Sequence, residues 1–169
     1  MKYFLYASLL LILICACSST NQTRDHRSAK SKVLAPSPAF DGNFNKALFK
    51  ASLDIRKQHL SGFLLIKKTD DTTYRVVFAN EIGMTMFDLG FHESRFRIHY
   101  IFEPMNKKIL LRLLENDFRQ LIFTSEPAKS SPLMKTIIKR EGREGEIPRR
   151  IEISNPVVKM NLDLTLISQ

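Results

Sequence analysis

The sequence predicts an α+β fold: a curved antiparallel sheet of about eight strands, forming an incomplete β-barrel, closed by one long amphipathic helix. Two observations support this. Apolar residues recur in steps of two along several stretches after residue 46, change once to helical spacing, and return to steps of two before the C-terminus. Short polar segments separate these stretches, as in a meander of antiparallel strands. We therefore expect five strands, a helix and three further strands, in that order.

The first strands follow from their alternation and their turns. Residues 49–55 alternate apolar and polar side chains, which predicts a strand with one buried and one solvated face. Residues 60–66 are apolar on both faces. A polar turn at 67–71 then leads into a partner strand at 74–79, and together the two strands predict a hairpin.

The fourth and fifth strands complete the first part of the sheet. We expect them at 84–91 and 95–102. The second of these alternates again, which places Arg95, Arg97 and His99 together on its polar face.

A single helix is expected over residues 106–123, with Asn106 after a proline as its N-cap. Its apolar face comprises Leu110, Leu113, Leu114, Phe118, Leu121 and Ile122. After a loop, three more strands are expected at 133–139, 148–154 and 158–167.

The N-terminus resembles a bacterial lipoprotein signal. Lys2 provides a positive start, and residues 4–14 are an apolar run too short to span a bilayer. The following Ile-Cys-Ala-Cys resembles a lipobox, whose last residue, Cys17, would be acylated after removal of residues 1–16. An ordinary cleaved signal with two incidental cysteines is the alternative.

The remaining chain divides into a tether and one domain. Residues 17–39 start at the lipidated Cys17 and then have almost no large apolar side chain, which predicts a flexible spacer. Residues 40–169 are long enough to bury a core of their own. Cys17 would be the only cysteine of the mature chain, so no internal disulfide and no cysteine metal site are expected.

The charge balance is basic, with 26 Lys and Arg against 17 Asp and Glu and a formal net charge of +9. Near a bilayer such charges attract anionic headgroups. A solvated basic surface is an equally good interpretation. No basic helix interleaved with aromatic residues occurs, so we expect no nucleic-acid partner.

When a single helix covers a sheet with one broad apolar face, the space between them can be filled in two ways. Either its own side chains fill the space as a solid core, or an apolar pocket remains between sheet and helix that could bind an acyl chain. Composition does not separate them. The predicted pocket lining is Phe49, Leu53, Ile55, Val76, Phe78, Met86, Phe96, Ile98, Tyr100, Leu114, Phe118, Leu162 and Leu164.

Four segments resemble the LolA and LolB superfamily of lipoprotein carriers and receptors and its uncharacterised lipoprotein relatives. They are SGFLL at 61–65, EIGMTMFD at 81–88, NDFRQL at 116–121 and IPRRIEI at 147–153. The resemblance covers about residues 45–168. It implies a curved half-barrel closed by helices around a cavity for acyl chains, and the LolB branch is itself an outer-membrane lipoprotein.

No pattern in the sequence predicts catalysis. His59, His92 and His99 are interpreted as surface residues, and Asp88 and Asp117 as hydrogen-bonding braces. Sequence motifs for metal, phosphate or nucleophile sites are lacking, so we expect no catalytic residues, no metal and no cofactor.

The sequence therefore predicts a non-enzymatic lipoprotein anchored at the periplasmic face of the outer membrane, with the inner membrane and the cell surface as open alternatives. Its partners would be the membrane, an acyl chain or lipoprotein lipid, and other envelope proteins. The expected function is acyl-chain binding in lipid or lipoprotein transport. The rival is a structural or interaction lipoprotein with a solid core.

Overall fold

The computed structural model of the protein describes residues 40, 43–92, 95–123, 135–143 and 145–169. The predicted signal peptide, the lipobox with Cys17 and the tether lie outside the described residues. In the described part, the order of five strands, a helix and three strands is confirmed. The elements are β1 (Lys46–Ile55), β2 (Gln58–Asp70), β3 (Thr73–Asn80), β4 (Thr85–His92), β5 (Phe96–Ile101), the short 3-10 helix η1 (Glu103–Met105), α2 (Lys108–Ile122), β6 (Ile137–Glu141), β7 (Arg150–Asn155) and β8 (Met160–Ser168).

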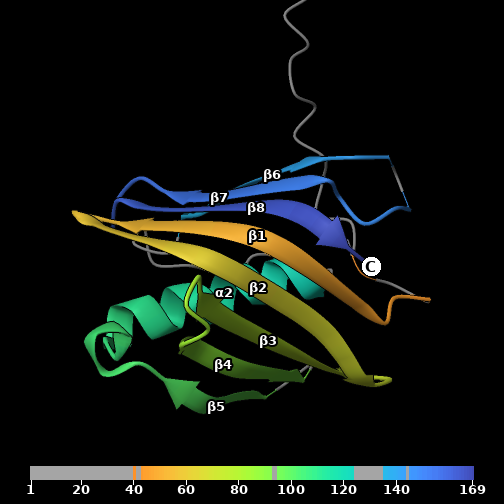
Figure 1. Cartoon of the computed structure of the whole chain (residues 1–169), viewed down its shortest axis with the longest axis horizontal. Helices are drawn as coiled ribbons and strands as arrows, with labels where there is room; N and C mark the ends of the chain where they lie inside the picture. Colours follow the sequence, from red (N-terminus) through yellow and green to blue (C-terminus); the bar gives the residue numbers. More distant parts are fainter. Residues whose placement is uncertain (1–39, 41–42, 93–94, 124–134, 144) are drawn as a thin grey trace, which may run out of the picture. The chain divides into compact units, whose positions relative to one another are not determined.

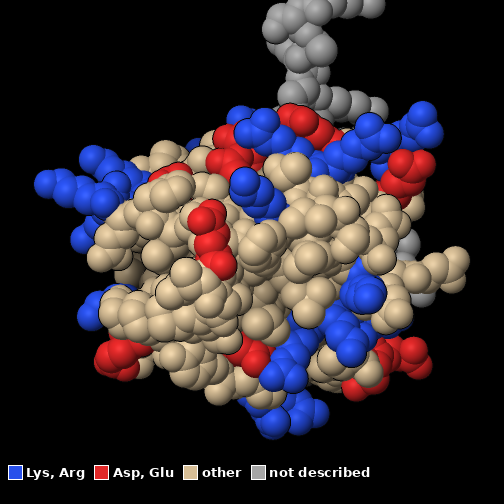
Figure 2. Space-filling view, viewed as in Figure 1, with Lys and Arg blue, Asp and Glu red and all other residues tan. Residues whose placement is uncertain are grey.

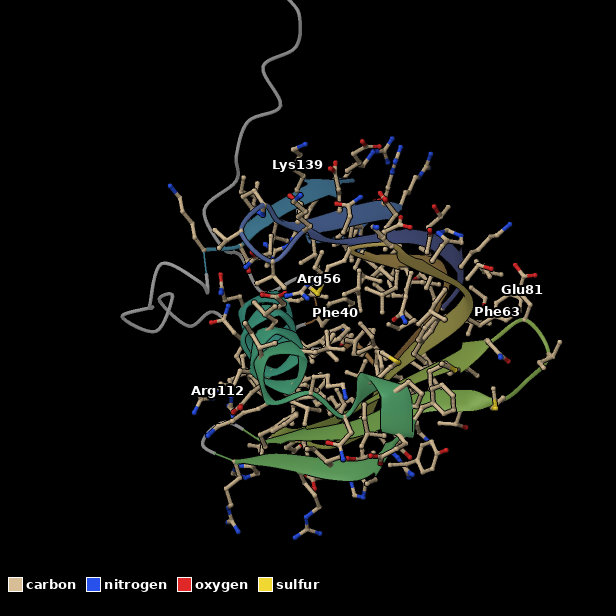
Figure 3. All side chains as sticks on the ribbon, turned by 90° about the vertical axis from the view of Figure 1, so that its left-hand side faces the viewer. Phe40, Arg56, Phe63, Glu81, Arg112 and Lys139 are labelled. Carbon is tan, nitrogen blue, oxygen red and sulfur yellow. The ribbon has the colours of Figure 1, made fainter. Side chains whose placement is uncertain are left out.

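The strands form one eight-stranded antiparallel sheet in the order β5-β4-β3-β2-β1-β8-β7-β6. β5 and β6 are its two edges, so the sheet is open and not a closed barrel. It curls into an arc, and α2 lies on the concave side, in the opening between the two edges (Figures 1 and 3). The prediction of an incomplete antiparallel barrel with one helix is confirmed at this level.

One glycine allows β2 and β3 to come very close together. A Cβ atom added at Gly62 would lie 2.0 Å from the carbonyl oxygen of Ala79, a distance that real side chains do not reach. Only a residue without a side chain fits there. Gly62 therefore allows the backbones of β2 and β3 to approach closely at this point.

The predicted turn at 67–71 is wrong, because β2 continues to Asp70. Lys67 pairs with Arg75 and Lys68 with Tyr74 in the ladder with β3. Polar residues remain in the strand because one side of it faces solvent, and residues 71 and 72 alone suffice for the turn.

Two other predicted boundaries are also wrong. β6 begins at Ile137 and not at 133, with residues 133 and 134 outside the described part. α2 begins at Lys108. Asn106 is not its N-cap, because the N–H of Asn106 donates to the carbonyl oxygen of Glu103 at 3.0 Å and closes η1. Lys107 occupies the cap position, without a side-chain capping bond.

Candidate functional site

Most of the predicted pocket-lining residues come together in one hydrophobic core between the sheet and α2. At no more than 2% exposure each, these are Phe49, Leu53, Val76, Phe78, Met86, Leu114, Phe118, Leu162 and Leu164. Ile55 and Phe96 are partly buried and pack against them. Ile98 and Tyr100 are 41% and 46% exposed, and Tyr100 pairs with Asp88, whose side chain points to the outer face with Arg75. The structure therefore does not bring Ile98 and Tyr100 into the interior.

Aromatic rings pack the interior from both sides. The ring of Phe118 on α2 lies 6.1 Å from that of Phe87 and 5.9 Å from that of Phe91, both on β4. Phe78 on β3 lies 5.4 Å from Phe87. These four side chains have no solvent-accessible surface, so they touch no space that a water molecule could enter. A hydrocarbon tail needs at least that width, so the interior around these residues is filled.

Asp117 is the one acid in this interior among the described residues, and it is 1% exposed on the core-facing side of α2. Its Oδ1 accepts hydrogen bonds from Thr136 Oγ1 at 2.7 Å and from Asn116 Nδ2 at 3.2 Å. Its Oδ2 has no partner among the described residues. Burial raises the pKa of Asp117 to about 6, and the two hydrogen bonds oppose this shift. The carboxyl braces α2 against the start of β6 and has no access to a substrate.

Two arginines attach α2 to opposite parts of the sheet. Arg119 Nη1 donates to the carbonyl oxygen of His92, at the end of β4, at 3.0 Å. Arg140 Nη2, on β6, donates to the carbonyl oxygen of Gln120, near the C-terminal end of α2, at 3.1 Å. Helix carbonyls at that end lack intrahelical partners, and a cation there also complements the helix dipole. The helix is thus held by directed contacts as well as by apolar packing.

An aromatic cluster at one side of the core was not predicted. Phe40 and Phe44 precede β1, and their rings lie 4.8 Å apart. The ring of Tyr74 stacks on Phe44 at 6.2 Å and meets Phe123, after α2, at 5.5 Å. Tyr74 also donates its hydroxyl to the carbonyl oxygen of Phe40 at 3.1 Å. Two aromatic residues in an otherwise polar segment were the available signal.

The histidines do not form a catalytic group in the described part of the chain. His59 Nδ1 lies 2.7 Å from Asp54 Oδ1 across an exposed hairpin end. His92 ends β4 and His99 lies on β5. Within the described ranges, no group of three or more His, Cys, Asp and Glu side chains is placed to hold a metal ion.

A groove of about 730 Å³ lies on the outer side of β3, β4 and β5. It is lined by Thr69, Thr73, Tyr74, Arg75, Gly90, Phe91, His92, Arg95, Phe96, Arg97 and His99. The rings of Tyr74 and Phe91 belong to the core, so the outer side chains of the groove are mainly basic. Arg95, Arg97 and His99, expected on one polar strand face, do come together here.

No model of a protein family matches the chain, and no curated protein matches it either. The resemblance to the LolA and LolB superfamily stays a prediction. Of the helices in the described residues, none has the length and apolar character needed to cross a membrane.

Proposed function

We propose that the protein is a lipoprotein of the cell envelope, anchored by acylated Cys17 at the periplasmic face of the outer membrane, and that its domain acts by binding and not by catalysis. The lipobox-like N-terminus supports the anchor. We further propose that the domain is an interaction module with a solid core, whose ligands bind to its outer surface.

The observation that carries this choice is the complete burial of the core. Nine of the thirteen side chains predicted to line a pocket, among them Phe49 on β1 and Phe118 on α2, are at most 2% exposed and pack against one another. The arginine contacts on both sides of α2 add a cost to moving the helix away.

An acyl-chain carrier of the LolA and LolB type is the second candidate. The architecture favours it, because an open, curled antiparallel sheet with a helix in its opening is what the resemblance implies. If the domain is such a carrier, this structure corresponds to a state in which the acyl-chain pocket is closed. A lipid would have to displace α2, at a cost offset by about 0.8 kcal/mol for each buried methylene group.

Purification of the full chain and mass spectrometry of its extract separates the two candidates. The interaction module is expected to carry no bound lipid beyond its own anchor, in a chain with intact Cys17 and in a Cys17→Ser variant alike. A stoichiometric second lipid in both chains would favour the carrier. Hydrolysis of an added lipid ester would contradict both.

Membrane fractionation of the Cys17→Ser variant tests the anchor separately. We expect the unmodified chain to sediment with membranes and the variant to be released. A variant that still sediments fully with membranes would show that lipidation of this residue does not hold the protein there.

A further inference from the structure

The outer face of β3, β4 and β5 carries a row of basic side chains with a gap in its middle. Arg75 pairs with Gly90, and Gly90 pairs with Arg97 on the next strand. Since neighbouring strands lie about 4.8 Å apart, the backbones of the two arginines stand roughly 10 Å apart. Gly90 has no side chain of its own, and the imidazole of His99 lies against it. Lys67 on β2 continues the row. Figure 3 shows side chains with nitrogen tips projecting outward from these lower, green strands.

The gap belongs to the groove of about 730 Å³ described above. His99 lies at its floor, because a Cβ atom added at Gly90 would come within 2.8 Å of His99 Nε2. A glycine is therefore what lets the imidazole rest against β4. His92 and Arg95 border the groove at the end of β4 and the start of β5.

Among the described residues, the side chains that line the groove are more often basic than acidic. Arg75 is fixed from one side by Asp88, with Nε to Oδ1 at 2.8 Å and Nη2 to Oδ2 at 2.5 Å. Arg95 and Arg97 have no carboxylate partner among the described residues. None of the described residues that line the groove is a carboxylate. A second described acid, Asp70, lies near His92: the pKa of Asp70 is lowered first by the backbone N–H of Thr72 and in smaller part by the charge of His92.

One polar atom of the groove is also left without a partner. His92 Nδ1 is shielded from solvent and has no hydrogen-bond partner among the described residues. Because solvent does not reach this nitrogen, a ligand in the open groove would not contact it, and the donors for such a ligand are the exposed basic groups of the groove.

We propose that this groove binds a phosphate group. Guanidinium groups present donors in a planar fork that matches two phosphate oxygens, and Arg95 and Arg97 are available for such contacts. Arg75 is held in place by Asp88, and the imidazoles can donate further hydrogen bonds. The volume suits a phosphorylated small molecule or a phospholipid headgroup. Phosphate binding at this place does not require Cys17 to be acylated.

The first experiment is a calorimetric titration of the full chain, in a neutral detergent, with inorganic phosphate. We expect saturable binding that the double substitution Arg95→Ala and Arg97→Ala weakens at least about tenfold, because it removes the charge-assisted hydrogen bonds of two guanidinium groups to the anion. The matched control is Arg112→Ala with Arg149→Ala, which removes two exposed arginines outside the groove and leaves the affinity unchanged.

Gly90→Ala separates the shape of the groove from its charge. This substitution keeps every basic group but displaces the imidazole of His99. We expect weaker phosphate binding with thermal unfolding close to that of the unmodified chain. Unchanged affinity would mean that scattered surface charge, and not this groove, attracts the anion, and the proposal would fail.

The second arm identifies the source of the phosphate. The unmodified chain, the groove variant and the control variant are each sedimented with phosphatidylcholine vesicles that contain or lack phosphatidylglycerol. All three have the same N-terminal region, so its contribution to vesicle binding is the same in each. Loss of the phosphatidylglycerol-dependent increment in the Arg95 and Arg97 double variant supports a lipid headgroup. Loss of inorganic phosphate binding alone supports a soluble phosphate compound. Equal behaviour of the groove variant and the control variant in both arms overturns the proposal.

Discussion

Asp117 makes the stability of the fold depend on pH. Its pKa rises from 3.8 to about 6 because the carboxyl is buried. Since the folded-state pKa lies above the unfolded value, the stabilising effect of its proton is complete below about pH 3.8 and is lost as the pH rises through 6. A shift of this size corresponds to roughly 3 kcal/mol.

We therefore expect Asp117→Asn to gain stability relative to the unmodified chain as the pH rises. Near pH 4 the Asn variant has no advantage in unfolding free energy, because Asp117 is then protonated in the folded protein. By about pH 7.5 the difference in unfolding free energy shifts towards the variant by roughly 3 kcal/mol, measured by urea denaturation. Asp71→Asn is the control, because Asp71 is exposed in the β2–β3 turn. If the difference in unfolding free energy between Asp117→Asn and the unmodified chain stayed constant with pH, the raised pKa of Asp117 would be contradicted.

Single residues also show the limit of sequence reasoning. The apolar spacing of the helix identified its buried face, but Asp117 lies on that face among leucines, and its partner Thr136 comes from a distant segment. The sequence placed Arg97 and His99 on one polar face. It could not show that Gly90 stands between Arg97 and Arg75, because that depends on the register of three strands.

Among the elements, α2 starts without the usual stabilising features. Lys107 holds the cap position with an extended backbone and no side-chain capping bond, and the first turn contains no acid. Two adjacent lysines, Lys107 and Lys108, face the positive end of the helix dipole. A better cap at this position should stabilise the whole domain.

We expect Lys107→Asp to raise the unfolding free energy by about 1–2 kcal/mol, since it adds a capping acceptor and removes an unfavourable charge. Lys107→Ala removes the same charge but provides no cap, so it should gain clearly less. Thermal and urea unfolding of the two variants measure the difference. Equal stability of the Asp and Ala variants would show that no capping bond forms.

Element boundaries were less predictable than element order. The alternation of apolar residues was sufficient for the strands and the helix, since one face of each is buried. The end of β2 was missed because Lys67 to Asp70 carry turn-like polar side chains, although their backbone pairs with β3. The close approach of Gly62 to the backbone of Ala79 depends on the pairing of β2 with β3, which no local pattern contains.

For the domain as a whole, the open question was whether the concave face of the sheet is filled. The same apolar residues predict a solid core or a pocket, because burial by neighbours and burial by a ligand need the same side chains. The structure fills the space through contacts between distant segments, such as Phe118 with Phe87 and Phe91. Only the three-dimensional packing distinguishes the two cases.

A substitution that creates a cavity tests this packing directly. Phe118→Ala should lower the unfolding free energy by about 3–5 kcal/mol and leave an apolar cavity. If the variant is too unstable, Phe118→Leu gives a smaller cavity at lower cost. We expect the Ala variant, but not the unmodified chain, to bind an apolar ligand of about the size of the lost ring, such as benzene. Ile109→Ala, on the exposed side of α2 at 37% exposure, is the control and should bind none.

Equal binding by the unmodified chain would mean that α2 opens readily, and the carrier would then replace the solid interaction module as the better account of this domain.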